Sequence, residues 1–245
     1  MVPAPRSGNV EMARVLRMYE EVFDDKRQTK MREYFRNELA KLSVLKVYDK
    51  NQIIDPACCE QAFAIVTRGI VAKSVVSTQG REKLLYLLRP GEIFGEMNLL
   101  DGGVLNYAVK AKTAAQVAFI GKKTLDEIIV SHPAVYDYLL HSITRKFRIV
   151  LLQSTNHLFN DSRGRVAEAL LRLSACSNEP GCTEESPMIS SPLTQSELAH
   201  NVGCSRVTVT RILKQFVREN LISIRNKRIV ILDAPTLISF TDRIQ

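Results

Sequence analysis

The sequence lacks the features that would assign it to a membrane or to a secreted, disulfide-linked scaffold. Its apolar runs fall well short of the roughly 18 residues that a membrane-spanning helix requires. Residues 1–10 do not show the basic and then apolar layout of a secretory signal. The 5 cysteines are odd in number and scattered, so a disulfide framework is not expected. These absences favour a cytoplasmic protein without a membrane partner.

Catalytic sequence motifs are also missing. The chain has no P-loop, no G-x-S-x-G, no H-E-x-x-H and no credible spacing for a catalytic triad, so we do not expect an enzyme. Of its residues, 45% are hydrophobic and 24% are charged, proportions that exclude disordered and collagen-like chains. The net charge of +8 is enough to raise the question of nucleic-acid binding.

The distribution of apolar and turn residues divides the 245-residue chain into four parts. Residues 1–35 form an N-terminal extension, which begins with a short Pro-containing segment and continues with helical spacing of its apolar residues. Residues 36–131 contain short β-branched runs between turn residues, which predict a compact all-β barrel or sandwich. These runs are Ala64–Thr67, Val71–Ser77, Leu84–Leu88, Ile93–Phe94, Tyr107–Ala111 and Val117–Gly121.

The third part, residues 132–160, is predicted to be one long helix that ends near Phe159. Some of its apolar residues recur at the alternating spacing of a coiled-coil seam, namely Leu140, Ile143, Phe147 and Val150. Other apolar side chains make the helix hydrophobic on more than one face. Two interpretations follow. The seam joins a second copy of the chain while another face packs on the barrel, or the whole helix lies in the core of a monomer.

The fourth part, residues 161–245, carries the strongest functional signal. Thr194 and Glu197 have the S/T-x-x-E spacing of a capping box, which starts a helix. Gly203 supplies the left-handed backbone of a tight turn, and Ser205 can cap the helix that follows. Two short helices joined by a glycine turn are typical of a helix-turn-helix.

The second helix of this pair has one apolar and one basic face. The residues predicted to face the core are Val209, Ile212, Leu213, Phe216 and Val217. The residues predicted to face outward are Arg206, Val207, Thr210, Arg211, Lys214 and Arg218. Two short strands then flank Asn226-Lys227, a connection that predicts a hairpin with a basic tip. Residues 199–232 hold seven Lys or Arg and one acid, a net +6, which favours DNA binding over a basic, solvated helical hairpin.

At this level of detail the chain resembles the catabolite-activator/FNR (CRP/FNR) family of bacterial transcription regulators. The motifs that carry the resemblance are Arg89-Pro-Gly-Glu-Ile-Phe-Gly-Glu96, the long helix, and Val202-Gly-Cys-Ser-Arg-Val-Thr-Val-Thr-Arg-Ile-Leu213. The resemblance implies an α+β protein with an N-terminal jelly-roll-like β-roll of the cyclic-nucleotide-binding type, a dimerisation helix and a C-terminal winged helix-turn-helix. It also implies a homodimer on a two-fold DNA operator, a small-molecule effector and contact with RNA polymerase.

The resemblance also assigns the DNA contacts. Arg206 and Arg211 match the family's two recognition-helix arginines, which form bidentate hydrogen bonds with guanine or bind phosphate. Well-studied relatives have Glu where this chain has Val207, which cannot accept a hydrogen bond from cytosine but can pack on a thymine methyl. We therefore expect a half-site richer in A·T. The contacts expected to the DNA backbone are Ser205, Thr208, Thr210, Lys214, Lys227 and Arg228.

The same resemblance bears on the effector. In relatives that bind cyclic nucleotides, a Gly-Glu pair is followed by Arg-Ser-Ala or Arg-Thr-Ala, and the Arg forks onto the cyclic phosphate. This chain keeps Gly95-Glu96 but has Asn106-Tyr107-Ala108 at the later element, so we do not expect cyclic AMP to be the effector. No cysteine precedes Cys58, which excludes the family's iron–sulfur sensor. The histidines are dispersed, and we expect no metal or other cofactor.

A looser resemblance connects the chain to the branch of the family that senses halogenated aromatic compounds and activates organohalide-respiration genes. It rests on the strand Arg81–Leu88, on Asn106-Tyr107-Ala108 and on the Val-Thr-Val of the recognition helix. The effector-pocket residues that it implies are Tyr86, Gly95, Glu96, Asn106 and Tyr107. The alternative is that the two tyrosines are ordinary core residues.

Two other functions are considered. Cys176 and Cys182 flank a loop with Pro, Ser and acidic residues, and a disulfide between them would make the protein a thiol-redox-responsive regulator of the same family. A non-DNA effector-binding signalling module would account for the β-roll but not for residues 161–245.

Overall fold

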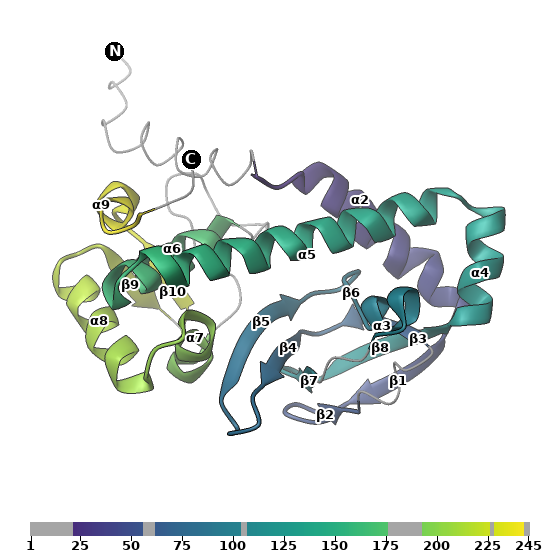
Figure 1. The fold of residues 1–245 in the computed structure, drawn as a ribbon, viewed down its shortest axis with the longest axis horizontal. Coiled ribbons are helices and arrows are strands. Elements are labelled where there is room, and N and C mark those ends of the chain that lie inside the picture. Colours follow the sequence, from purple (N-terminus) through teal and green to yellow (C-terminus); the bar gives the residue numbers. More distant parts are fainter. Residues whose placement is uncertain (1–21, 56–61, 104–106, 176–192, 226–227, 243–245) are drawn as a thin grey trace, which may run out of the picture. The chain divides into compact units, whose positions relative to one another are not determined.

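The computed structural model describes residues 22–55, 62–103, 107–175, 193–225 and 228–242 (Figure 1). The chain forms two compact units. One consists of the described residues from Asp25 to Phe147, and the other of the described residues from Arg148 onward together with those before Asp25. Helices combined with antiparallel sheets confirm the predicted α+β class. Within the described ranges, no helix is both long enough and apolar enough to cross a membrane.

The first unit is built on two four-stranded antiparallel sheets, with the strand orders β1-β8-β3-β6 and β2-β7-β4-β5. Each strand run predicted from the sequence corresponds to one of their strands. The strands are β1 (Val44–Tyr48), β2 (Ile53–Ile54), β3 (Ala62–Arg68), β4 (Val71–Val76), β5 (Glu82–Leu88), β6 (Ile93–Phe94), β7 (Tyr107–Ala111) and β8 (Ala115–Gly121). Together they form the predicted β-roll (Figure 1).

Four short elements of this unit were not predicted. In β1 every side chain except Tyr48 is exposed, so the strand has no alternation of buried and exposed positions. β2 has only two residues. The helices α3 (Glu96–Asp101) and α4 (Lys122–Ser131) follow directly on β6 and β8. They are too short for a periodic pattern to separate them from the strands.

The core of this unit explains why β3 is apolar on both faces. Phe63 and Ile65 pack in one cluster with Phe35 of the helix α2 (Asp25–Asn37). Val66, on the opposite face of β3, packs in a second cluster with Val71 of the other sheet. A sheet covered on both faces buries successive residues, so its strands appear as continuous apolar runs.

The turn between β5 and β6 is bound to α2 through Glu92. The Glu92 carboxylate accepts hydrogen bonds from Arg32 at 2.7 Å, from Gln28 at 2.7 Å and from the backbone N–H of Arg89 at 2.8 Å. Gly91 has φ +85°, and a Cβ there would lie 2.3 Å from the backbone oxygen of Arg32. The Pro-Gly-Glu part of the family motif is therefore structural, because it packs α2 against the roll.

The second unit contains the C-terminal part of the long helix α5 (Ala134–Phe159) and all the elements after it. These are α6 (Ser162–Ala175), α7 (Gln195–Val202), α8 (Arg206–Arg218), β9 (Ile222–Arg225), β10 (Arg228–Ile231) and α9 (Ala234–Ser239). The pair α7 and α8 and the strands β9 and β10 agree with the predicted helix-turn-helix and hairpin. The predicted loop between Cys176 and Cys182 lies outside the described residues.

A buried polar network holds α5, α6 and α7 together within this unit. The Asn156 amide on α5 donates to Glu168 at 2.7 Å. Arg172 donates to Glu168 at 3.1 Å and to Asn201 of α7 at 3.0 Å. All four residues are buried. A satisfied buried network specifies a single arrangement of its elements, so α7 is held in place relative to α6.

Candidate nucleic-acid interface and effector pocket

The helix-turn-helix is formed as the capping residues predict. Thr194 accepts from the backbone N–H of Glu197 at 3.1 Å, and Glu197 accepts in return from the backbone N–H of Thr194 at 2.7 Å. α7 ends at Gly203, whose φ of +67° is left-handed. α8 begins after Ser205, which accepts from the backbone N–H of Thr208 at 3.1 Å. Local sequence signals therefore determine the angle between the two helices.

α8 presents its basic face to solvent. Its buried residues are Val209, Ile212, Leu213 and Phe216. Val217 is 39% exposed, so its predicted core position is wrong. It lies at the edge of the apolar stripe, where the next turn of the helix already faces solvent. Val207 is 78% exposed and lies on the outer face of the helix.

An open groove follows this face. The residues that line it are Gln195, Arg206, Val207, Thr210, Arg211, Lys214 and Arg218. Four of them are cations and none is acidic, so the groove attracts polyanions. The Thr210 hydroxyl lies 2.5 Å from the side-chain oxygen of Gln195 and 2.8 Å from the Arg206 carbonyl, and its single proton can be donated to either oxygen. Gln195 was not among the predicted contacts. It follows the Thr194 cap at the start of α7, and its side chain contacts Thr210 of α8.

The other predicted DNA contacts lie near this groove or in the hairpin. Ser205 and Thr208 are hydrogen-bonded to each other at 2.8 Å, at the start of α8. The hairpin pairs Arg225 with Arg228 across its last described position. Lys227 lies outside the described residues.

Two of the predicted effector residues meet at Lys146 of α5. The Lys146 ammonium donates to the Glu96 carboxylate at 2.6 Å and to the Ile93 carbonyl at 2.7 Å. The Tyr86 hydroxyl donates to the Lys146 carbonyl at 3.2 Å. Burial alone would raise the pKa of Glu96, but the nearby ammonium groups of Lys146 and Lys73 lower it overall. Glu96 is therefore an ionised carboxylate, only 1% exposed, held by the long helix.

Burial raises the pKa of the Tyr86 phenol well above its usual value, and the nearby Glu96 carboxylate raises it further. The hydroxyl therefore keeps its proton and acts as a donor at physiological pH.

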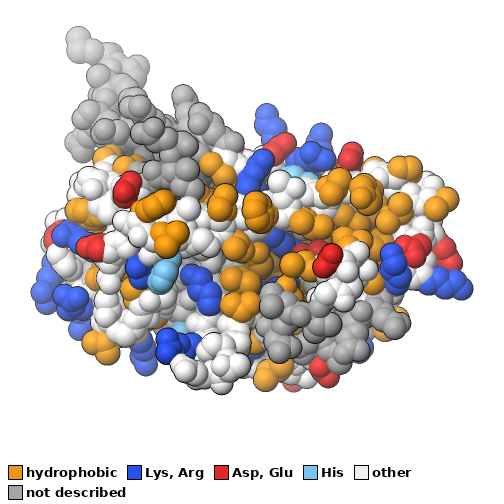
Figure 2. Space-filling view, viewed as in Figure 1, with side chains coloured by type: hydrophobic (Ala, Val, Ile, Leu, Met, Phe, Trp, Pro, Cys, Tyr) orange, Lys and Arg blue, Asp and Glu red, His pale blue; other side chains and the backbone are white. Residues whose placement is uncertain are grey.

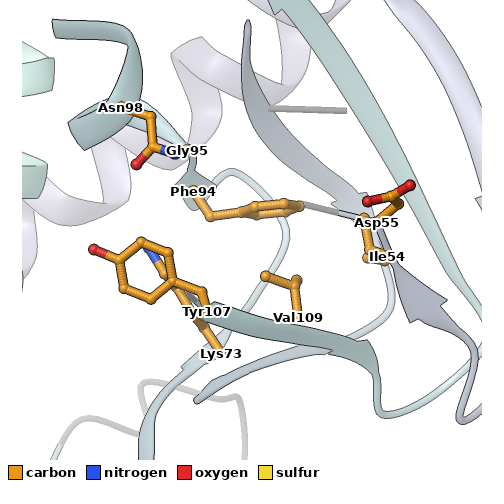
Figure 3. A pocket seen from close by; sticks show the side chains of 8 residues that line it. All are labelled: Ile54, Asp55, Lys73, Phe94, Gly95, Asn98, Tyr107 and Val109. Carbon is orange, nitrogen blue, oxygen red and sulfur yellow. The ribbon is translucent and has the colours of Figure 1, made fainter. Parts of the chain in front are cut away.

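The other two described effector candidates, Gly95 and Tyr107, line a small pocket beside this ion pair (Figure 3). Its empty space is about 310 Å³ when the open mouth is counted, but the centre of a water-sized sphere can occupy only about 20 Å³ of it, so the side chains in this conformation leave room for little more than a water molecule. Its further lining residues are Ile54, Asp55, Lys73, Phe94, Asn98 and Val109. The predicted effector residues therefore fall into two pairs. Tyr86 and Glu96 contact Lys146, whereas Gly95 and Tyr107 line the pocket. Asn106 lies outside the described residues.

Lys73 was not predicted as a site residue. It is 2% exposed, and its Nζ lies 3.6 Å from the centroid of the Tyr107 ring. The sequence could have indicated this inward position, because Lys73 follows Val71 by two residues and residues two apart in a strand face the same side of the sheet.

The seam residues of α5 remain accessible in the single chain. Phe147 is 65% exposed and Leu140 is 47% exposed, whereas Ile143 and Val150 are half-buried. Hydrophobic side chains gather along α5 in the space-filling view (Figure 2). An exposed apolar strip of this kind marks an interaction site.

Within the described ranges, no three His, Cys, Asp or Glu side chains lie close enough to hold a metal ion. Cys58, Cys59, Cys176 and Cys182 lie outside those ranges. The redox disulfide therefore stays a prediction.

A β-roll with an internal pocket, followed by a winged helix-turn-helix with a basic recognition helix, defines a class of DNA-binding regulators. Comparison with known proteins places the chain in the same class. Residues 45–132 match the cyclic nucleotide-binding domain and residues 164–240 match the Crp-like helix-turn-helix domain. The cAMP-activated global transcriptional regulator CRP of Salmonella typhimurium is 31% identical over 194 residues, which cover 79% of this chain and 91% of that protein. The chain belongs to the CRP/FNR family of transcription regulators.

Solved structures show the same fold. A mutant of CooA from Carboxydothermus hydrogenoformans superposes with a TM-score of 0.72 at 20% identity, covering 86% of this chain and 94% of that one. CprK complexed with OCPA superposes with a TM-score of 0.68 at 19% identity, and the match covers 85% of this chain and 94% of that one. Identities this low support the shared fold and do not assign this chain to either protein's branch.

Proposed function

We propose that the protein is an effector-responsive regulator that binds a two-fold operator as a homodimer in the cytoplasm, without catalytic activity. The observation that carries the proposal is the outer face of α8, whose exposed cations Arg206, Arg211, Lys214 and Arg218 line one groove with no acid among them. A helix of this kind enters the major groove, and two copies contact half-sites one helical turn apart. Contact with RNA polymerase follows from the family.

Within this groove we assign base reading to the residues near the start of α8. Side chains at the N-terminal end of a recognition helix reach base edges, whereas later ones reach phosphate. Arg206, Val207 and Arg211 are therefore the proposed reading residues. Thr210 is bound to Gln195 at 2.5 Å, so we assign these two to positioning and backbone contact. The remaining proposed backbone contacts are Ser205, Thr208, Lys214, Lys227 and Arg228.

Val207→Glu should change the preferred half-site. The valine side chain is 78% exposed and can offer only apolar contact, whereas a glutamate accepts from a cytosine amino group. The variant should gain about 1–3 kcal/mol for a C·G pair at one position. The measurement is a binding selection on randomised duplexes with both proteins side by side.

Val217→Glu is the matched control for this test. It places the same charge on the same helix but outside the groove, so it should leave the selected sequence unchanged. If wild type and Val207→Glu enrich the same half-site, Val207 does not read a base. Selection of no sequence at all by the wild type would contradict the proposed function itself.

We further propose that the roll binds a small molecule other than cyclic AMP. Glu96 is engaged by Lys146 at 2.6 Å, and Tyr107 stands at the element where nucleotide-binding relatives carry Arg-Ser or Arg-Thr. An aromatic compound, as in the halogenated-aromatic-sensing branch, is the proposed ligand, because the Phe94 and Tyr107 rings line the pocket. A disulfide between Cys176 and Cys182 is the second candidate switch.

Cyclic AMP should show no saturable binding in the micromolar range. The anionic phosphate would have no arginine to fork onto it at residues 106–108, and such a pair is the strongest single contact that the ligand could make. Isothermal titration calorimetry on the full chain checks this. Stoichiometric heat with micromolar affinity would overturn the exclusion of cyclic AMP and leave the DNA-binding assignment intact.

A further inference from the structure

The last described residues of the chain lie against the junction between α5 and α6. Asn160, the first residue after α5, is 5% exposed. Its side-chain amide donates to the backbone carbonyl of Asp242 at 3.0 Å and accepts from the backbone N–H of Asp242 at 2.7 Å. The same amide donates to the side-chain oxygen of Asn156 at 2.9 Å. Both amide protons and the amide oxygen of Asn160 are therefore engaged, mostly by the backbone of a residue near the C-terminus.

Gly164 of α6 leaves room for this close approach. A Cβ at residue 164 would lie 2.4 Å from the carbonyl oxygen of Phe240 and 2.9 Å from the side-chain oxygen of Asn160. Atoms in a packed interior do not approach so closely, so a larger residue at this position would push the C-terminal segment, residues 240–242, away from α6.

The other end of the C-terminal segment packs against the recognition helix α8. The ring of Phe240 stacks on that of the buried Phe216 of α8, with centroids 5.9 Å apart and an interplanar angle of 11°. The Arg163 guanidinium of α6 lies 3.8 Å from the centroid of the Phe240 ring. The same guanidinium forms a 2.7 Å ion pair with Glu219, the residue that follows α8. The C-terminal segment therefore connects the end of α5 with α8.

These contacts lie within the unit that also contains the end of the proposed dimer seam. Val150 of the seam precedes Asn160 by 10 residues on the same helix. In a homodimer the seam surrounds the two-fold axis, and the distance from this axis to each recognition helix determines how far apart the half-sites must be. A buried polar group with all its hydrogen bonds satisfied specifies a single arrangement of the elements that it joins. Asn160 is therefore placed to hold this distance constant.

We propose that Asn160 is a positioning residue, which holds the C-terminal segment against the end of α5 and so fixes the half-site spacing that the dimer accepts. This inference rests on the homodimer of the proposed function. It concerns the spacing of the operator and not the sequence of its half-sites, because neither Asn160 nor Asp242 lines the groove of α8. Without the amide of Asn160, each recognition helix can tilt relative to the end of α5, and duplexes with other spacings are bound as well.

The experiment is a competition gel shift with duplexes that carry two copies of the selected half-site at centre-to-centre separations of about 8 to 13 base pairs. The wild type should prefer one separation by about tenfold or more over those one base pair longer or shorter, because bivalent binding is lost when the geometry does not match. Asn160→Leu removes the amide and keeps a side chain of similar size, so its preference should fall to about threefold or less. Its half-site sequence, selected on randomised duplexes, should remain that of the wild type.

Asp242 offers a second variant and a matched control at one exposed position. Asp242→Pro removes the N–H that the Asn160 oxygen accepts, so it should relax the spacing as Asn160→Leu does. Asp242→Ala removes the same carboxylate but keeps both backbone groups, so it should retain the spacing of the wild type. Circular dichroism and thermal melting monitor folding, and Asp242→Pro decides if Asn160→Leu unfolds.

Three outcomes would overturn the role of Asn160. They are a wild type that binds all separations equally, a folded variant that keeps the wild-type spacing preference, and weaker binding of every duplex without a change in that preference. The last would mean that Asn160 contributes to stability alone. A wild type that selects isolated half-sites would instead contradict the homodimer of the proposed function, on which this inference rests.

Discussion

Phe147→Glu should convert the proposed dimer into a monomer and abolish most of its operator binding. Phe147 lies on the seam of α5 and is 65% exposed in the single chain, and in the proposed dimer the second copy would cover it. In a dimer the new carboxylate would be buried against its own symmetry mate, where two like charges cannot both be accommodated. The loss of bivalent binding should lower operator affinity by about 100-fold or more.

Sedimentation velocity at micromolar concentration measures the first effect, and a gel shift on the selected operator measures the second. Thr144→Glu is the matched control, because Thr144 is an exposed residue of the same helix beside the seam. It should remain dimeric. A wild-type protein that sediments as a monomer at this concentration would refute the dimer, and the long helix would then have to be explained by packing within one chain.

Lys146→Met should destabilise the roll by roughly 3 kcal/mol, because it leaves Glu96 as a buried carboxylate without its 2.6 Å partner. Urea unfolding of the full chain measures the loss. Lys122→Met is the control. Its partner Asp126 lies at 3.0 Å, but both side chains are more than half exposed, so the expected cost is only about 0.3–0.5 kcal/mol.

The pH dependence of this loss identifies its cause. Lys146 and Lys73 lower the pKa of Glu96 against the effect of burial. Without Lys146 the folded-state pKa rises, the folded protein binds more protons, and its stability recovers as the pH falls. The loss of unfolding free energy in Lys146→Met, relative to the wild type, should therefore be smaller at pH 5 than at pH 8. The double variant Lys146→Met/Glu96→Gln should lose less than Lys146→Met alone, and equal or greater loss would mean that the ion pair is not the cause.

The two functional regions differ in how far the sequence predicts them. The helix-turn-helix is determined by local signals, namely the Thr194 and Glu197 capping box, the left-handed Gly203 and the Ser205 cap. Each of these acts within one turn of helix, so residue identity alone specifies the geometry. The outward face of α8 follows from the 3.6-residue period, and only Val217, at the edge of the apolar stripe, was misplaced.

The effector region depends on contacts between residues far apart in the chain. Glu96 was selected because of a family motif, and Tyr86 because of the looser resemblance to one branch of the family. The structure shows both bound to Lys146, which lies 50 residues after Glu96. Lys73 faces Tyr107 because β4 and β7 are neighbours in the sheet, although 34 positions separate the two residues. No local pattern encodes such pairings.

The sequence by itself therefore determined the family, the strand runs of the roll, the long helix and the basic outer face of α8. Periodicity and capping act over a few residues, and the basic charge of α8 does not depend on the rest of the fold. Only the tertiary structure decided that Glu96 is held by the long helix and that Lys73 supplies the buried cation of the pocket. Both facts depend on which strands and helices become neighbours, and that is settled by burial of the whole core.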